Sequence, residues 1–307
     1  MKILHLETYE ELLAEVNEFW NSRSDKPEET PNSLLKALWH TACGAPVSAE
    51  RALQMTLPPL DNSGYERLRG LLDLKKTGIP LAHLTQRQNF LGLEFFAGPD
   101  ALIPRKETEI LGRAVLAKLK LLAEERGQLM VVDMCTGSGN LALAYAYHEP
   151  AARVYGSDIA GEAVTLARRN ALQMGLHERV NFLQGDLFAP FESGAFSKCD
   201  ILSCNPPYIS TAKVAQMHHE ISRFEPGVAF DGGPYGISVV SKLVKNAPRF
   251  LKPSSWLAFE VGLGNGDIFA RQLQKNPAFC EVETHTDTVG NIRAILCKSM
   301  PEAHCGG

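Results

Sequence analysis

The sequence predicts an α/β protein whose main domain is a doubly wound, mostly parallel, seven-stranded sheet, preceded by a small helical domain. From residue 128 onward, short apolar runs alternate with segments of helical periodicity, which is typical of a parallel sheet covered by helices on both faces. Up to residue 88, the apolar residues recur at helical spacing instead. With 307 residues, 45% of them hydrophobic, the chain is long enough for one medium-sized domain and a smaller one.

Residues 1–88 are expected to form the helical domain. Leu34, Leu35 and Leu38 lie on one face of a predicted helix, and Gly44 supplies a left-handed stop after it.

A second helix of this domain is expected to begin near Ser63, because Ser63 and Glu66 have the spacing of a capping box. Residues 89–103 alternate loosely between apolar and polar side chains and contain glycine, which predicts a short β-hairpin linking the two domains.

Residues 104–300 are expected to form the sheet domain, starting with a helix at about 107–125. The residues Val289-Gly-Asn291 are typical of a turn, so the last two strands should form an antiparallel hairpin at the edge of the sheet. The expected strands are 129–134, 153–157, 180–183, 200–204, 256–261, 281–286 and 292–297, and the expected helices between them are 140–147, 161–174, 239–250 and 267–274.

The bulk composition excludes several classes of function. A net charge of −4 and a pI near 6.2 provide no basic field to hold a long polyanion, so direct nucleic-acid binding is not expected. The seven cysteines form no C-x-x-C pair, which argues against a structural zinc site or a disulfide framework. No metal site is predicted, because His218 and His219 have no third ligand spaced to join them. The N-terminus lacks the apolar core of a signal peptide, so a cytoplasmic location is expected.

The first functional motif is a turn of small residues between a predicted strand and a predicted helix, Val131-Val-Asp-Met-Cys-Thr-Gly-Ser-Gly-Asn140. A doubly wound sheet places such a turn at the carboxyl edge of its strands, where ligands bind. Glycines allow the backbone to approach a ligand closely, and the start of the helix offers free N–H groups. The alternative is a tight turn without a ligand, because G-x-G alone is a weak signal. The candidate cofactor contacts in this turn are Asp133, Cys135, Thr136, Gly137, Ser138 and Gly139.

Two further acids follow the next two strands. Asp158 ends one of them and could accept hydrogen bonds from both hydroxyls of a ribose, although an aspartate here could instead cap the following helix. Asp186 could accept from the exocyclic amine of adenine, with Leu187 against the ring; the alternative is a plain surface turn. Together with the first motif, these acids predict a nucleoside ligand.

The most informative stretch is Asn205-Pro-Pro-Tyr208, at the end of the fourth strand. Proline lacks an N–H group and fixes φ, so Pro206 and Pro207 hold a rigid arch. We expect the arch to leave the Pro206 carbonyl and the Asn205 side-chain oxygen free to accept hydrogen bonds from a planar –NH2 group. Tyr208 can then lie against the π system of that group. A purely structural Asn-Pro-Pro turn is the alternative.

These motifs resemble class I methyltransferases that use S-adenosylmethionine, and within them the release factor glutamine methyltransferases. The likeness extends over about residues 78–297, and the first 77 residues match only as a small helical domain. Cys135 replaces the usual first glycine of the cofactor loop, Lys106 a proline, and Pro234-Tyr235 an acidic site. The further stretches that carry the resemblance are Gly78-Ile-Pro-Leu-Ala-His-Leu-Thr85, Ile103-Pro-Arg-Lys-Glu-Thr-Glu109, Phe224-Glu-Pro-Gly-Val-Ala-Phe-Asp-Gly-Gly-Pro-Tyr-Gly-Ile237 and Glu260-Val-Gly262.

The resemblance implies that S-adenosylmethionine is the cofactor and that a methyl group passes to the side-chain amide nitrogen of a glutamine. The partner it implies is a peptide-chain release factor, which carries this glutamine in a Gly-Gly-Gln loop; some relatives modify a ribosomal-protein glutamine. The helical domain would then recognise the substrate. By resemblance only, the residues that help to position substrate are Arg105, Glu107, Thr108 and Glu225, although a buried structural role for Glu225 is an equal alternative.

Two other functions are compatible with the same motifs. A small-molecule biosynthetic enzyme could use this scaffold, in view of the changes at Lys106 and Pro234. Adenine-amine DNA methyltransferases also have an Asn-Pro-Pro-Tyr clamp, but they need a basic DNA-reading region that this acidic chain does not show.

Overall fold

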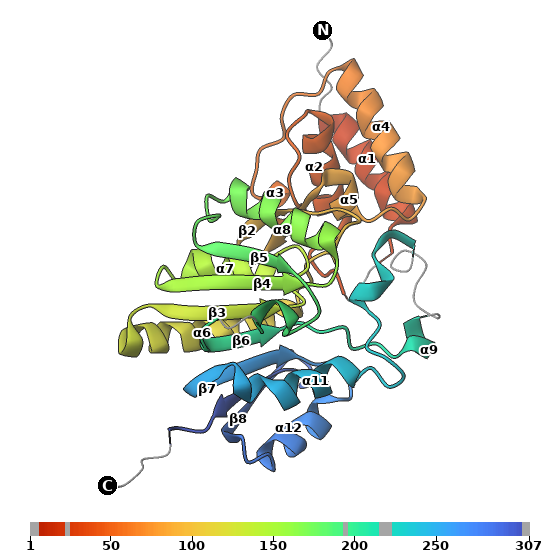
Figure 1. Cartoon of the computed structure of the whole chain (residues 1–307). Helices are drawn as coiled ribbons and strands as arrows, with labels where there is room; N and C mark the ends of the chain where they lie inside the picture. The colour runs from red at the N-terminus through yellow and green to blue at the C-terminus, as the bar shows by residue number, and fades with distance from the viewer. Residues whose placement is uncertain (1–5, 22–24, 193–195, 215–222, 303–307) are drawn as a thin grey trace, which may run out of the picture. The chain divides into compact units, whose positions relative to one another are not determined.

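The computed structural model describes residues 6–21, 25–192, 196–214 and 223–302 (Figure 1). The chain divides into two compact units. A helical unit comprises Met1–Lys106 together with His218–Glu225, and a sheet unit comprises Glu107–Met217 and Pro226–Gly307.

The helical unit has an apolar core of its own. Leu34 and Leu38 of its second helix meet Leu68 and Leu72 of its fourth, and all four side chains are fully buried. A two-stranded antiparallel hairpin follows the helices, with Phe90 opposite Leu93. The elements of this unit are α1 (Leu6–Phe19), α2 (Pro31–Ala42), α3 (Ala49–Leu53), α4 (Asn62–Lys76), α5 (Leu81–Thr85), β1 (Arg87–Phe90) and β2 (Leu93–Phe96).

The predicted capping box at Ser63 is wrong. Helix α4 begins at Asn62, and its N-cap is Asp61, two residues before Ser63; the Asp61 Oδ1 accepts from the Gly64 N–H at 2.7 Å. Ser63 donates to the same oxygen at 3.0 Å, so it supports the cap without being it. A carboxylate just before the first turn is a strong acceptor for the unpaired N–H groups there, and it takes the capping position.

The sheet unit is built on a seven-stranded sheet in the order β5-β4-β3-β6-β7-β9-β8. Its first five strands along the chain run parallel, and β9 is antiparallel to both of its neighbours. In the view of Figure 1, α6 and α7 lie behind the sheet and α11 and α12 in front of it. The elements are α6 (Thr108–Arg126), β3 (Leu129–Met134), α7 (Asn140–His148), β4 (Ala152–Asp158), α8 (Gly161–Gln173), β5 (Val180–Gln184), η1 (Ala189–Phe191), β6 (Cys199–Cys204), α9 (Thr211–Val214), η2 (Gly227–Ala229), α11 (Ser238–Asn246), η3 (Ala247–Arg249), β7 (Leu251–Glu260), α12 (Gly266–Gln274), β8 (Phe279–Thr286) and β9 (Ile292–Ser299).

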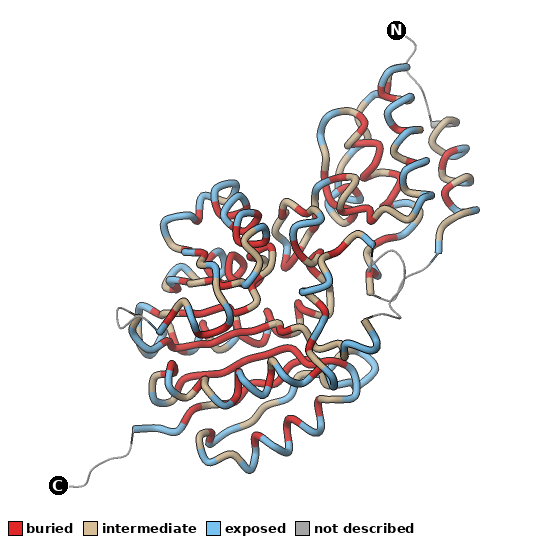
Figure 2. Tube along the Cα trace, turned by 45° about the vertical axis from the view of Figure 1, so that its right-hand side comes forward, coloured by how far each residue is buried: buried red, intermediate tan, exposed pale blue. Residues whose placement is uncertain are grey.

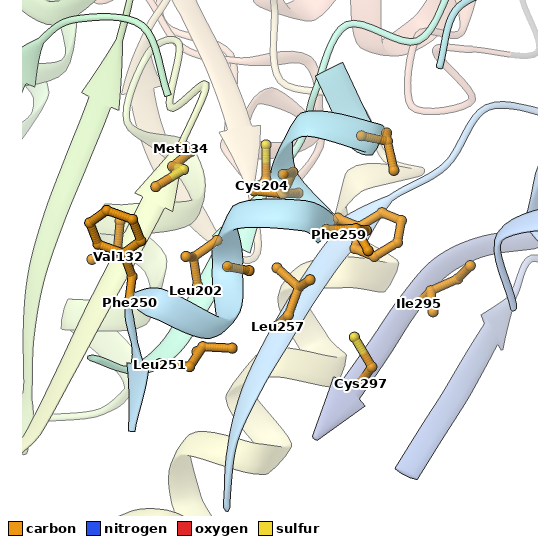
Figure 3. Packing of buried hydrophobic residues seen from close by; sticks show 14 of the residues in the cluster. Val132, Met134, Leu202, Cys204, Phe250, Leu251, Leu257, Phe259, Ile295 and Cys297 are labelled. Carbon is orange, nitrogen blue, oxygen red and sulfur yellow. The ribbon is translucent and has the colours of Figure 1, made fainter. Parts of the chain in front are cut away.

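The central strands of this sheet are buried from end to end. Every residue of β6 is buried, and Figure 2 shows the middle strands as continuous buried segments. One face packs against α11 and α12, whose Val240, Leu243 and Phe269 join the cluster of sheet residues drawn in Figure 3. This core fixes the strand ends, and therefore the loops that follow them.

The fold confirms the predicted doubly wound, mostly parallel sheet with its antiparallel edge, and two segments differ in detail. The helix expected at 239–250 ends at Asn246, because Pro248 cannot continue it and a 3₁₀ turn follows instead. Strand β7 starts at Leu251, five residues before the expected position, with Leu251 already paired to Cys199. Among the described residues, no helix is long and apolar enough to cross a membrane.

Candidate active site

The site lies at the carboxyl edge of the sheet, where the loops after three neighbouring strands meet. Strand β3 lies between β4 and β6, and its last residue, Met134, is paired with Ser157 on one side and Cys204 on the other. The turn after β3 therefore runs between Asp158 and Asn205. The structure thus brings together the first, second and fourth motifs that the sequence indicated.

The two glycines of the first turn have different tasks. Gly139 has φ +79°, and a Cβ on it would lie 2.8 Å from the ring of Phe182, so packing demands glycine there. Gly137 has φ +54°, and a Cβ on it would meet nothing within 4 Å, so this turn is open on that side. The Gly137 N–H donates to Asp158 Oδ2 at 2.8 Å, which joins the turn to the end of β4.

Cys135 adopts a left-handed conformation, with φ +56°. Side chains other than glycine are strained there, and a strained residue in a candidate ligand loop is consistent with function. Leu187, in the loop after β5, is also left-handed, with φ 44°. Its side chain belongs to the sheet core, with 9% of its surface exposed.

Asp133 is fully buried beneath the turn. The Thr136 hydroxyl donates to its Oδ2 at 2.6 Å, and Ser203 lies close enough to form a second hydrogen bond. The Tyr145 hydroxyl is hydrogen-bonded to the Ser203 hydroxyl at 2.9 Å, so Tyr145 joins the buried polar side chains around Asp133. Burial raises the pKa of Asp133 to about 7, and the hydrogen bonds from Thr136 and Ser203 oppose this rise.

The residues of this edge are compatible with a nucleoside. Asp158 accepts one backbone N–H on each oxygen, from Gly137 at 2.8 Å and from Ala160 at 3.0 Å. A carboxylate has about four lone-pair positions, so two acceptor positions remain for ribose hydroxyls. Burial raises the pKa of Asp158, and the backbone N–H groups oppose this. Asp186 is exposed in the loop after β5.

The Asn-Pro-Pro-Tyr loop presents free acceptors at the end of β6. Asn205 Nδ2 donates to Thr108 Oγ1 at 3.2 Å, so the amide oxygen points away from Thr108. Within the part of the chain that the structure describes, neither Asn205 Oδ1 nor the Pro206 carbonyl has a hydrogen-bond donor. The arrangement can accept two hydrogen bonds from one planar –NH2 group.

Three glycines elsewhere in the sheet unit make room for this loop. A Cβ on Gly262 would lie 2.8 Å from the ring of Tyr208. A Cβ on Gly232 would lie 2.6 Å from the Pro207 carbonyl oxygen, and one on Gly236 would clash with the Tyr208 carbonyl. The segment around Asp231-Gly-Gly-Pro-Tyr-Gly236 therefore packs its backbone against the clamp.

Sequence reasoning did not place Glu260 in the site. It ends β7, the strand beside β6, and its Oε1 accepts from the Tyr208 hydroxyl at 3.1 Å. In the sequence, Glu260 stood out only as the first residue of Glu260-Val-Gly262, one of the stretches that resemble the family. Its position at the end of an apolar strand, as in the case of Asp158, was the signal that could have identified it.

The residues expected to position substrate fall into two groups. Thr108 is 2% exposed and supports Asn205, while Glu107 is half-buried beside it. Arg105 and Glu225 belong to the helical unit and pair with each other, Arg105 Nη2 lying 2.5 Å from Glu225 Oε1. The other oxygen of Glu225 accepts from the Ile103 N–H at 2.9 Å. His218 and His219 lie outside the described residues.

Comparison with known proteins places the chain among methyltransferases. The family described as Methyltransferase small domain matches residues 111–225. The crystal structure of the hMettl16 catalytic domain has the same fold, with a TM-score of 0.51 at 13% sequence identity, over 74% of this chain and 84% of that one.

Two curated relatives resemble this chain over most of its length. The release factor glutamine methyltransferase of Moorella thermoacetica is 37% identical over 274 residues, which cover 89% of this chain and 93% of that protein. The protein of the same name from Bacillus subtilis is 33% identical over 237 residues, covering 77% of this chain and 81% of that protein. With identity at this level and an Asn-Pro-Pro-Tyr clamp at the edge of a class I methyltransferase sheet, the chain belongs to the release factor glutamine methyltransferase family.

Proposed function

We propose that this protein methylates the side-chain amide nitrogen of a glutamine in the Gly-Gly-Gln loop of a peptide-chain release factor, in the cytoplasm, with S-adenosylmethionine as methyl donor. The observation that carries the proposal is the pair of unused acceptors, Asn205 Oδ1 and the Pro206 carbonyl. A primary amide has two N–H hydrogens in one plane, and two acceptors from one rigid loop can hold both. The names of the curated relatives support the choice of acceptor.

The clamp is needed because an amide nitrogen is a poor nucleophile, its lone pair being delocalised into the carbonyl. Acceptors on both hydrogens draw electron density toward the nitrogen and fix which of its faces is presented. Orientation of this kind accelerates reactions by several orders of magnitude. The carbonyl dipoles also stabilise the positive charge that develops on nitrogen. The nitrogen then loses one hydrogen as a proton to water.

The other residues of the edge hold the methyl donor. When bound, S-adenosylmethionine supplies an electrophilic methyl group on sulfur. Asp158 offers its remaining lone pairs to the ribose hydroxyls, and the open side of the turn at Gly137 lets the ligand approach the backbone. Asp186 accepts from the adenine amine, and Tyr208 lies against the substrate amide. The helical unit recognises the protein substrate.

The proposal is tested by incubating the purified protein with labelled S-adenosylmethionine and a release factor, and by locating the label with mass spectrometry. We expect one methyl group on the glutamine of the Gly-Gly-Gln loop. A release factor with asparagine in place of that glutamine is the matched substrate control and should stay unlabelled. Parallel incubations contain DNA or a small-molecule extract. Label in either of these, with none in the release factor, would overturn the proposal.

The clamp itself is tested with Asn205→Ala. This variant should lose ~2–4 kcal/mol of transition-state stabilisation, because one of two acceptors is gone. Binding of S-adenosylmethionine, measured by calorimetry, should largely survive. Full activity of Asn205→Ala would show that the amide oxygen does not hold the substrate.

A further inference from the structure

A buried carboxylate lies behind the clamp. Glu260 is 1% exposed, and no part of the chemistry proposed above uses it. Burying a carboxylate is unfavourable unless it is hydrogen-bonded or paired with a charge, so its retention in the core calls for a physical reason.

Two hydroxyl groups lie beside Glu260. The Tyr208 hydroxyl lies 3.1 Å from Oε1. Burial raises the pKa of the Glu260 carboxyl, and the nearby Thr108 hydroxyl opposes this rise. Among the described residues, Glu260 Oε2 has no hydrogen-bond partner in good geometry. The positive charge of Arg293, which is 8% exposed on β9, also lowers the pKa of this carboxyl. The carboxylate therefore contacts two residues that each touch the clamp.

The direction of these hydrogen bonds follows from the chemistry of the groups. In the proposed arrangement Glu260 is ionised beside the charge of Arg293 and accepts the single hydroxyl hydrogen of Thr108, since an ionised carboxylate only accepts. The lone pairs of Thr108 then remain for its other neighbour, which is the Asn205 amide at 3.2 Å. Asn205 can donate only with its nitrogen, so that nitrogen must face Thr108. The amide oxygen is left on the opposite side, toward the substrate.

The same carboxylate orients the aromatic ring. It accepts from the Tyr208 hydroxyl, and Gly262, two residues further along, leaves room for the ring against the backbone. The Glu-Val-Gly sequence therefore meets Tyr208 at two points, its hydroxyl and its ring.

We propose that Glu260 is a positioning residue, which sets the orientation of the Asn205 amide through Thr108 and holds the Tyr208 ring by its hydroxyl. The inference rests on the proposed function, because it explains how the clamp presents an acceptor. Glu260 itself touches neither the substrate nor the methyl donor. It acts by fixing the donors and acceptors of residues that do.

The deciding variant is Glu260→Gln, which keeps the shape of the side chain. Its –NH2 group can donate to Thr108, which frees the threonine hydrogen to turn toward Asn205. The Asn205 amide then inverts and presents –NH2 to an incoming –NH2 group. We expect kcat to fall about 100-fold, because removing one oriented hydrogen-bond partner of a reacting group has an effect of this size. KM and the affinity for S-adenosylmethionine should be unchanged. The matched control Glu178→Gln, at an exposed position, should keep the wild-type rate.

A second pair of variants keeps the test valid if Glu260→Gln fails to fold. Thr108→Val has nearly the same volume without the hydroxyl and should lower kcat, and Thr108→Ser should restore most of the rate that Thr108→Val loses. If Glu260→Gln folds and retains the wild-type kcat, or if Thr108→Ser is as slow as Thr108→Val, the positioning role is wrong.

A readout that does not depend on activity separates this inference from the proposed function. In ¹⁵N NMR, the side-chain amide hydrogens of Asn205 should change their chemical shifts and exchange faster in Glu260→Gln, because the hydrogen bond to Thr108 is lost. If the wild-type protein fails to methylate a release factor but this change is seen, the proposed function fails and the role of Glu260 stands. If the Asn205 signals are unchanged, the role of Glu260 fails whatever the substrate is.

Discussion

At the scale of single residues, the buried acid under the first turn couples stability to pH. Asp133 keeps its proton in the folded protein up to a pH of about 7, because burial disfavours the charged form, whereas an unfolded aspartate loses its proton near pH 4. Between these values the folded state binds more protons than the unfolded state. The free energy of unfolding should therefore fall as pH rises from about 4 to 7, by up to about 4 kcal/mol.

Asp133→Asn removes this titration while keeping a side chain of the same shape. Urea unfolding of both proteins at several pH values should show a smaller loss of stability with rising pH in the variant. Identical slopes for the two proteins would mean that Asp133 is ionised in the folded state well below pH 7.

Some site residues could be placed from the sequence alone, whereas their contacts could not. Asn205 directly follows one strand and Asp158 ends another, so the sequence alone brings them to one edge of the sheet. The hydrogen bond between Asn205 and Thr108 joins positions 97 residues apart, and no local pattern predicts it. The pairing of Arg105 with Glu225, across 120 residues, is a similar case. Short-range periodicity identifies which elements exist, whereas these contacts depend on tertiary packing.

At the scale of secondary-structure elements, four segments of the sheet unit meet at the start of β6. Asp200 accepts from the Met130 N–H of β3 at 2.9 Å, and it pairs with Arg126 at the end of α6 and Lys252 at the start of β7, at 2.9 and 2.7 Å. Its side chain is fully buried. Burial alone would raise its pKa, but these partners outweigh burial and hold the pKa below its usual range. Its stabilising contribution is therefore present at neutral pH and is lost only in acid.

Asp200→Asn should lower the free energy of unfolding by about 3 kcal/mol, because two cations lose their buried partner. Glu283→Gln is the matched control, since Glu283 pairs with Lys118 at 2.6 Å but is 30% exposed, and the loss there should stay below about 1 kcal/mol. Urea denaturation measures both. Equal losses for the two variants would show that the buried group does not hold these elements together.

Element boundaries were less predictable than the elements themselves. The strands β3 and β6 were expected within one residue of where they lie, because their apolar runs end sharply at turn residues. The early start of β7 at Leu251 has no such signal: Pro253 and two serines interrupt the run, and pairing with β6 makes the strand. The Asp61 cap was missed because Ser63 and Glu66 offered a competing local pattern.

At the scale of the whole molecule, each unit has buried apolar clusters of its own among the described residues. Leu38, fully buried in the helical unit, and Leu257, fully buried in the sheet unit, belong to different cores. Leu38→Ala should destabilise the helical unit by about 3 kcal/mol through the cavity it leaves. Leu257→Ala should do the same to the sheet unit.

Differential scanning calorimetry should resolve two transitions and show that each variant shifts a different one. Added S-adenosylmethionine should raise only the transition that Leu257→Ala lowers, because a ligand stabilises the part of the chain that binds it. A single transition that both variants and the ligand shift together would mean that the two cores unfold as one.

The burial of Cys204 has a consequence for chemical selectivity. A sulfonium methyl donor is an alkylating agent, and sulfur in its thiolate form is a far better nucleophile than any amide. Cys204 directly precedes Asn205, with the Cys135 thiol as its neighbour, and burial, more than that neighbour, raises its pKa well above the usual range. The sulfur therefore stays protonated and unreactive at neutral pH. Burial in the sheet core should thereby keep this thiol from being methylated, although it adjoins the residue that we propose holds the methyl acceptor.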